Sequence, residues 1–126
     1  MSAQLTPFIS NAKCLYINLT ERTDRNAQVL EQLCLIGITE PIRFNAIRHK
    51  NGAVGCTQSH IECLKIAKEN GWPYVIVVED DILFLNPNRF LNNCDALIRE
   101  HPIDSWDVVL IAGNNAGPYK QLSPSC

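Results

Sequence analysis

The chain has 126 residues, of which 46% are hydrophobic and 19% are charged, so it can fold around a single hydrophobic core. Its formal net charge is -2 and it has no block of basic residues, which gives no reason to expect nucleic acid or an anionic membrane as a partner. No apolar run approaches the roughly 20 residues of a membrane span, and the N-terminal residues lack the order of a secretion signal, so we expect a cytoplasmic protein.

The first part of the chain predicts two strands separated by a helix. Residues 13–19 are largely apolar and favour a strand that stops at a polar turn. Thr23 or Asp24 is expected to cap the following helix, whose apolar residues repeat at helical spacing until Gly37 ends it. A short second strand is predicted over residues 42–46.

The second part of the chain repeats this alternation. Helical spacing predicts a helix over residues 57–70, and residues 74–79 form the most apolar strand candidate, which we expect to be central in the sheet. A helix over residues 88–100 and a fourth strand over residues 106–112 follow. Residues 113–126 have the Gly, Pro and Ser content of a loop.

Strands that alternate with helices indicate an α/β fold with a mostly parallel sheet flanked by helices. Ligands bind such sheets at the carboxyl ends of the strands. The loop after the first predicted strand contains Arg22 and Arg25, and the third predicted strand ends in Glu79, Asp80 and Asp81. We therefore expect an arginine-bearing loop and an acidic loop at the same edge of the sheet.

The three adjacent acids suggest a metal site. Neighbouring carboxylates repel one another unless a cation or hydrogen-bond donors offset their charge, and Mg²⁺ or Mn²⁺ prefers such hard oxygen ligands. Because strand side chains alternate, Glu79 and Asp81 should point one way and Asp80 the other, unless a turn intervenes. The alternative is a solvated acidic turn that caps the next helix. We favour the metal site because the preceding strand is so apolar.

The two arginines allow two interpretations. Arg22 and Arg25 lie three residues apart at a predicted helix start, where guanidinium groups and free N–H groups can bind a phosphate. An ordinary exposed first turn fits the same spacing.

The six cysteines include no CxxC pair, and without a secretion signal we expect free thiols that act as small hydrophobes. Cys56, His60 and Cys63 share one face of a predicted helix and could ligate a metal ion. We favour packing of this face on the sheet, because structural zinc normally needs a fourth ligand.

Four segments of the chain, in this order, resemble the sequence blocks of glycosyltransferase family 25, which contains bacterial lipooligosaccharide galactosyltransferases and collagen galactosyltransferases. The segments are YINLTERTDR, RFNAI, GAVGCTQSH and YVIVVEDDI, and together they cover about residues 14–83. The matching residues include Asn18, Leu19, Arg22, Asp24 and Arg25 in the first block, Phe44 and Ala46 in the second, Gly55, Cys56, Ser59 and His60 in the third, and Glu79, Asp80 and Asp81 in the fourth.

The resemblance implies a GT-A-like fold of the Rossmann type and a role in lipopolysaccharide biosynthesis. It implies inverting transfer of galactose or glucose from a UDP-sugar to a glycan or hydroxyl acceptor, with Mn²⁺ or Mg²⁺ held by Glu79 and Asp81 in a DxD-like motif. His60 fits a ligand contact and a packing role at a helix start equally well. Residues that the resemblance assigns to nucleotide-sugar binding are Asn18, Leu19, Arg22, Asp24, Arg25, Ser59, His60 and Asp80.

The chain departs from the family in two ways. The loop after the second block is short and contains Arg48 and His49, where many members have an Asp-Gly pair. The family domain also extends well beyond this chain. We therefore expect residues 1–126 to be one domain, the nucleotide-sugar-binding half, which a second domain or a homo-oligomer completes, and no catalytic base is assigned.

Two other functions remain as alternatives. A half-domain of this kind could bind a nucleotide-sugar or a partner chain without turnover. Paired acids could also hold Mg²⁺ for phosphoryl transfer, but that chemistry needs an acceptor aspartate at another strand end. The other predicted strand ends, around Leu19, Ala46 and Ala112, offer none.

Overall fold

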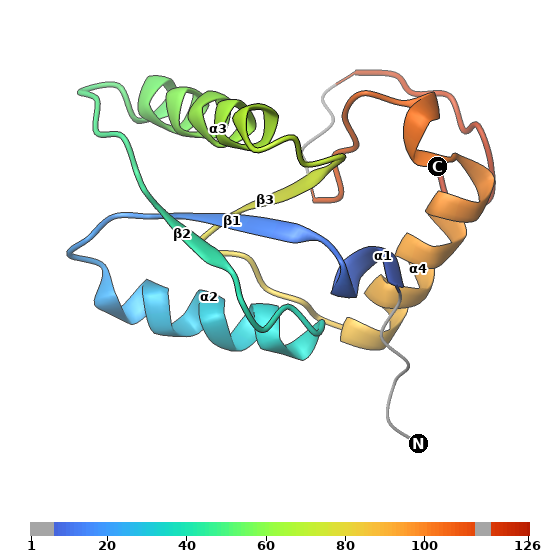
Figure 1. The fold of residues 1–126 in the computed structure, drawn as a ribbon, viewed down its shortest axis with the longest axis horizontal. Helices are drawn as coiled ribbons and strands as arrows, with labels where there is room; N and C mark the ends of the chain where they lie inside the picture. The colour runs from blue at the N-terminus through green and yellow to red at the C-terminus, as the bar shows by residue number, and fades with distance from the viewer. Residues whose placement is uncertain (1–6, 113–116) are drawn as a thin grey trace.

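The computed structural model describes residues 7–112 and 117–126, which form an α/β layer with helices on both faces of a parallel sheet (Figure 1). This confirms the predicted fold class of a Rossmann-like layer. The elements are α1 (Pro7–Ser10), β1 (Lys13–Asn18), α2 (Thr23–Leu35), β2 (Ile42–Asn45), α3 (Gly52–Glu69), β3 (Val75–Glu79), α4 (Pro87–Glu100) and the 3₁₀-helix η1 (Ile103–Ser105).

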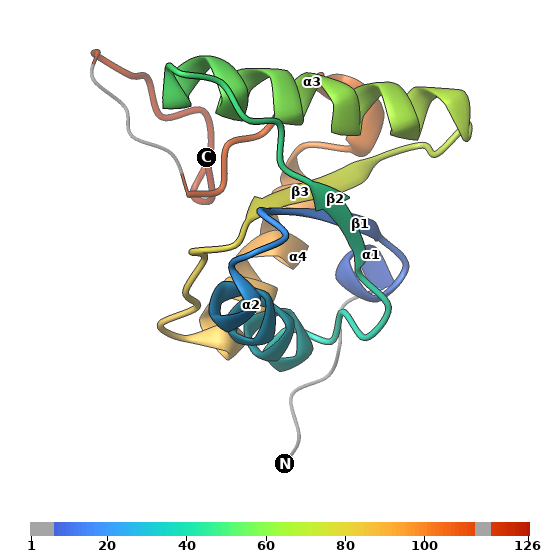
Figure 2. The same cartoon turned by 90° about the vertical axis from the view of Figure 1, so that its left-hand side faces the viewer.

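Within the described residues the sheet has the order β2-β1-β3, with all neighbouring strands parallel. Helix α2 follows β1 on one face of the sheet, and α3 follows β2 on the opposite face (Figure 2). The chain therefore leaves the carboxyl ends of β1 and β2 in opposite directions. In open α/β sheets, such a divergence creates a crevice where ligands bind.

Alternation along β1 builds the core on both faces. Cys14 and Tyr16 pack into one buried cluster with residues of α2 and α4, whereas Leu15 and Ile17 pack with Cys63 of α3 in the other. The same period of two applies to β3, where Val78 belongs to the first cluster. The two faces of the sheet therefore determine toward which helix each residue at a strand end points.

The prediction that residues 74–79 form the central strand was wrong. β1 occupies the centre, and five of its six residues are buried. In β3 only Val78 is fully buried, because β3 pairs with β1 alone among the described strands. A continuous apolar run in a strand thus indicates that both faces of the strand are covered by helices. It does not indicate that the strand has a neighbouring strand on each edge.

The predicted fourth strand over residues 106–112 was also wrong. This segment is irregular, and Val108 and Leu110 are 70% and 80% exposed. A strand is stable only when another strand satisfies its backbone N–H and C=O groups, and no described strand lies beside this segment. Residues 117–126 contain no helix or strand, as predicted, and residues 113–116 lie outside the described residues.

Two helix starts differ from prediction. The N-cap of α2 is Arg22, without a side-chain cap, so Thr23 and Asp24 lie inside the first turn and the predicted caps were wrong. Helix α3 begins at Gly52, because the Asn51 side chain accepts a hydrogen bond from the N–H of Ala53.

The predicted end of α2 is confirmed. Gly37 adopts a φ of 86°, and its N–H donates to the carbonyl of Cys34. None of the helices in the described ranges has the length and apolar character that crossing a bilayer requires.

Candidate functional site

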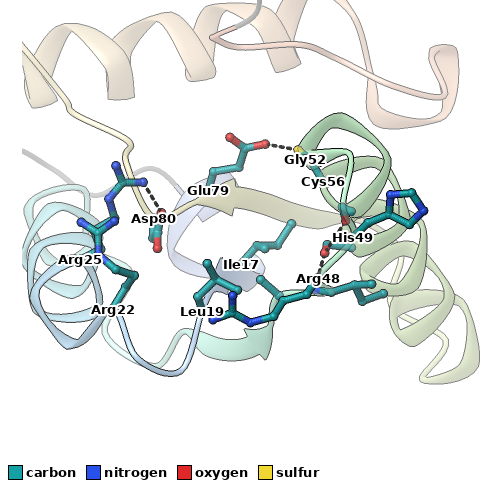
Figure 3. Close-up of a pocket in the computed structure, with 14 residues that line it drawn as sticks. Ile17, Leu19, Arg22, Arg25, Arg48, His49, Gly52, Cys56, Glu79 and Asp80 are labelled. Carbon is teal, nitrogen blue, oxygen red and sulfur yellow. Dashed lines mark hydrogen bonds and ion pairs between the residues drawn. The ribbon is translucent and has the colours of Figure 1, made fainter.

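A pocket of about 320 Å³ lies at the carboxyl ends of the strands, in the crevice where the chain leaves β1 and β2 (Figure 3). Its walls come from the ends of all three strands, the start of α2 and the first turns of α3. The lining residues are Ile17, Leu19, Arg22, Arg25, Ala46, Ile47, Arg48, His49, Gly52, Gly55, Cys56, Ser59, Glu79 and Asp80.

The acidic triplet divides at the end of β3. Glu79 is the last strand residue and points toward α3, whereas Asp80 turns toward α2 (Figure 3). A hydrogen bond from the N–H of Ile82 to the carbonyl of Glu79 closes a turn over Asp80 and Asp81. Glu79 and Asp80 therefore face different partners instead of facing one another, which reduces their mutual repulsion.

Asp80 is buried and bound from two sides. The side-chain amide of Asn18 donates to its Oδ2 at 2.8 Å, and the Arg25 guanidinium lies 3.4 Å from its Oδ1. The Arg43 guanidinium in turn donates to Asn18 Oδ1 at 3.0 Å and to the main-chain carbonyl of Asn18 at 2.9 Å. One polar network thus joins the carboxyl ends of β1, β2 and β3.

Glu79 forms a second network with α3. Its Oε1 accepts a hydrogen bond from the Cys56 thiol at 2.8 Å and lies 3.1 Å from His60 Nε2. The Cys56 hydrogen bond, followed by the His60 contact, lowers the pKa of Glu79 below its usual value. The same carboxylate raises the pKa of Cys56 to about 11, chiefly through this hydrogen bond, and the negative charge of Asp81 adds to the effect.

Arg22 and Asp24 are paired with each other at the start of α2. The guanidinium donates to both carboxylate oxygens of Asp24, at 3.0 and 2.9 Å. This hydrogen bonding lowers the pKa of Asp24, with Arg22 as its largest cause. Of the two predicted arginines, Arg25 is therefore the one whose guanidinium faces the acidic turn.

The wall between β2 and α3 is held by a buried hydroxyl. Ser59 Oγ accepts from the N–H of Ile47 at 2.9 Å and donates to the carbonyl of Gly55 at 2.8 Å. A Cβ atom on Gly55 would lie 2.6 Å from the carbonyl oxygen of Ile47, so only glycine allows this close approach. At the rim, Arg48 forms an ion pair with Glu21.

The structure brings most of the predicted site residues to one edge but not all into one cavity. Leu19, Arg22, Arg25, Ser59, Glu79 and Asp80 line the pocket, whereas Asn18, Asp24, His60 and Asp81 do not. His60 lies in the middle of α3, because this helix starts five residues earlier than predicted. Its side chain contacts Glu79 rather than a helix start.

Sequence reasoning did not assign Arg43, Arg48 and His49 to the site. Arg48 and His49 line the pocket, and Arg43 holds Asn18. The position of Arg48 and His49 in the loop after β2 could have indicated their role, because that loop leaves the same edge of the sheet as the acidic turn.

Two of the three carboxylates in the acidic triplet, those of Glu79 and Asp81, have oxygens that fit a hard divalent cation. Cys56 and His60 both contact Oε1 of Glu79, and Oε2 has no hydrogen bond to the described residues. Asp81 is exposed and makes no hydrogen bond or ion pair within the described ranges, and its charge acts on the same Cys56 thiol. Glu79 and Asp81 thus each keep carboxylate oxygens without a hydrogen bond to the described residues, and such oxygens are ligands that Mg²⁺ and Mn²⁺ accept.

Fold and site together define an α/β protein with a Rossmann-like parallel layer and a polar pocket at its carboxyl edge. Residues 50–111 match the model of glycosyltransferase family 25, described as LPS biosynthesis protein. The matched range includes the third and fourth of the four sequence blocks, in agreement with the family that these blocks predict. The matched segment contains α3, β3 and the acidic triplet. Searches of curated proteins and of solved structures found no match.

Proposed function

We propose that the chain binds a UDP-sugar in the pocket and acts in the transfer of a hexose, galactose or glucose, to a glycan or hydroxyl acceptor. The observation that supports this most strongly is the convergence of Arg25, the first turns of α3 and the carboxylates of Glu79 and Asp80 on one pocket. The match of residues 50–111 to the model of glycosyltransferase family 25 supports the reaction class.

Two features of the pocket favour a diphosphate. The ion pair between Arg25 and Asp80 is 3.4 Å long, so the Arg25 guanidinium keeps donors available for phosphate oxygens. Gly52 and Gly55 present the N-terminal end of an 18-residue helix to the pocket, and this end of a helix favours negative charge. Asn18, Leu19, Arg22, Asp24, Ser59 and His60 would shape or support the nucleotide-sugar subsite around these groups.

Glu79 and Asp81 are proposed to hold Mn²⁺ or Mg²⁺, which when bound supplies positive charge that stabilises the departing diphosphate. Asp80 faces the other way and orients Asn18 and Arg25 on the nucleotide side. In the reaction the bond between the anomeric carbon and the UDP oxygen breaks, and an acceptor oxygen bonds to that carbon from the opposite face. The acceptor proton passes to a base outside the assigned residues.

A second domain or a second copy of the chain is proposed to supply the acceptor contacts and that base. We also propose a cytoplasmic location, because all six cysteines are free thiols. The test of the function is calorimetry with UDP, with and without Mn²⁺, followed by measurement of free UDP released from UDP-galactose and UDP-glucose.

Metal-dependent UDP binding with sugar-dependent UDP release is the expected result. UDP binding without any release would contradict a transferase and leave a binding module. Absence of metal-dependent UDP binding would contradict the proposed donor site itself.

A further inference from the structure

Three side chains with different donor atoms meet beside the pocket. Cys56 and His60 are four residues apart on α3, which places them on the same face of the helix, and Glu79 reaches them from the end of β3. The thiol sulfur, an imidazole nitrogen and a carboxylate oxygen all lie within 4.8 Å of one another. The third residue of the face considered from sequence, Cys63, is instead buried in the core with Leu15 and Ile17.

We propose that Cys56, His60 and Glu79 form a binding site for a borderline-soft divalent transition metal ion, with Zn²⁺ as the best match. This site goes beyond the proposed function, because it needs neither UDP nor sugar. Sulfur and imidazole nitrogen are ligands that Zn²⁺ accepts readily and that Mg²⁺ and Mn²⁺ take poorly.

The spacing of the donors suits this ion. Sulfur and nitrogen lie 2.8 and 3.1 Å from Glu79 Oε1. Ligand atoms around tetrahedral zinc are roughly 3.5 Å apart, given bond lengths of about 2.0–2.3 Å. Small rotations of the three side chains would therefore open the space, and their location at the surface allows such rotations.

Binding replaces one proton. The Cys56 thiol loses its proton to solvent as the thiolate bonds to Zn²⁺, and the ion takes the place of the hydrogen bond that now joins Cys56 to Glu79. The His60 side chain is 40% exposed and that of Glu79 45%, so the fourth coordination position faces solvent and can hold water. The arrangement is that of an open three-ligand site.

Glu79 links this site to the proposed donor site. A Zn²⁺ ion bound by Cys56, His60 and Glu79 would withdraw this carboxylate from the pair with Asp81. Zn²⁺ should therefore compete with Mn²⁺ at the acidic turn, while binding tightly through ligands that Mn²⁺ does not use.

The test uses Co²⁺ as a spectroscopic substitute and Zn²⁺ in competition with a chromophoric chelator, on the full chain without UDP. The expected result is a thiolate-to-cobalt absorption band in the near ultraviolet that is lost in Cys56→Ser. We expect His60→Gln and Glu79→Gln to weaken Zn²⁺ binding by at least about tenfold. The control is Cys34→Ser, which removes an exposed thiol on α2 and should leave the band and the affinity unchanged.

A missing band, a band that persists in Cys56→Ser, or equal Zn²⁺ affinity in all four variants would overturn the proposal. Circular dichroism of each variant identifies any loss of fold, and Cys56→Ala then provides a second thiol-free variant. If Zn²⁺ binding fails while UDP binds with Mn²⁺, only this inference falls. If Zn²⁺ binds while UDP does not, the donor site falls and this site remains.

Discussion

The side-chain amide of Asn18 donates to Oδ2 of Asp80 across 2.8 Å and ties the end of β1 to the turn after β3. Asn18 is only 2% exposed, and its own oxygens accept from Arg43 of β2. A single buried amide therefore connects all three strands at the edge of the sheet that carries the pocket.

Asn18→Ala should destabilise the fold by about 1–3 kcal/mol, because it leaves the buried Asp80 carboxylate without its closest donor. The free energy of unfolding from urea denaturation measures this. Asn92→Ala, at an exposed position of α4, is the control and should change stability by less than about 0.5 kcal/mol. Equal effects of the two substitutions would contradict a structural role for the Asn18 network.

Gly55→Ala should also destabilise the protein, by about 1–3 kcal/mol, because the added methyl group would meet the Ile47 carbonyl at 2.6 Å. Gly52→Ala, in the same helix, adds a methyl group with no atom within 4 Å and should be neutral or stabilising. Thermal unfolding of the two variants side by side measures the difference. A Gly55→Ala protein as stable as the parent would show that the β2–α3 loop does not approach the helix so closely.

Cys56 should react slowly with iodoacetamide although it is exposed, because its pKa is raised from 9.0 to about 11. A pKa two units higher leaves about a hundredfold less thiolate at pH 8. Peptide mapping after alkylation at graded pH should show the Cys56 rate rising until about pH 11. Glu79→Gln removes the charge that raises the pKa and should move this rise to lower pH; an unchanged profile would rule out the Glu79 contact as its cause.

Asp81→Ala should abolish the part of UDP affinity that depends on Mn²⁺, since this exposed carboxylate is a proposed metal ligand. Titration calorimetry with and without the ion gives the difference directly. Asp104→Ala removes an exposed acid of η1, far from the acidic triplet in sequence, and should retain the full Mn²⁺ effect. Unaltered Mn²⁺ dependence in Asp81→Ala would remove this residue from the site.

Arg25→Ala should weaken UDP binding even without metal, by about tenfold or more, because a charge-assisted contact contributes roughly 1.5–3 kcal/mol. The dissociation constant for UDP in the presence of a metal chelator is the appropriate measurement. Arg89→Ala on the exposed start of α4 removes the same charge elsewhere and should leave that constant unchanged. If both variants bind UDP like the parent, Arg25 is a surface residue that only pairs with Asp80.

Local sequence patterns predicted the features that depend on local rules. The period of two along a strand gave opposite directions for Glu79 and Asp80, and the structure shows Glu79 toward α3 and Asp80 toward α2. Gly37 ended α2 as predicted, because its positive φ is a local property. These features need no knowledge of which elements become neighbours.

The features that were missed depend on contacts between distant segments. The order of the strands could not be read from the apolar run before Glu79, since hydrophobicity does not state which edge is paired. The apolar composition of residues 106–112 suggested a strand, but pairing requires a partner that the pattern does not supply. The contact of Cys56 and His60 with Glu79 likewise depends on the position of α3 along β3. Tertiary packing determines this position, and the local sequence pattern does not.

The central position of β1 has a consequence for how the protein opens. Among the described strands, β1 alone is hydrogen-bonded along both edges, and its side chains fill both clusters of the core. In native-state hydrogen exchange, the amides of β1 should therefore be the slowest to acquire deuterium, with those of β2 and β3 exchanging earlier. A ligand bound over the end of β1 would therefore contact the part of the sheet that opens least often, whereas the surrounding loops could open without disrupting β1.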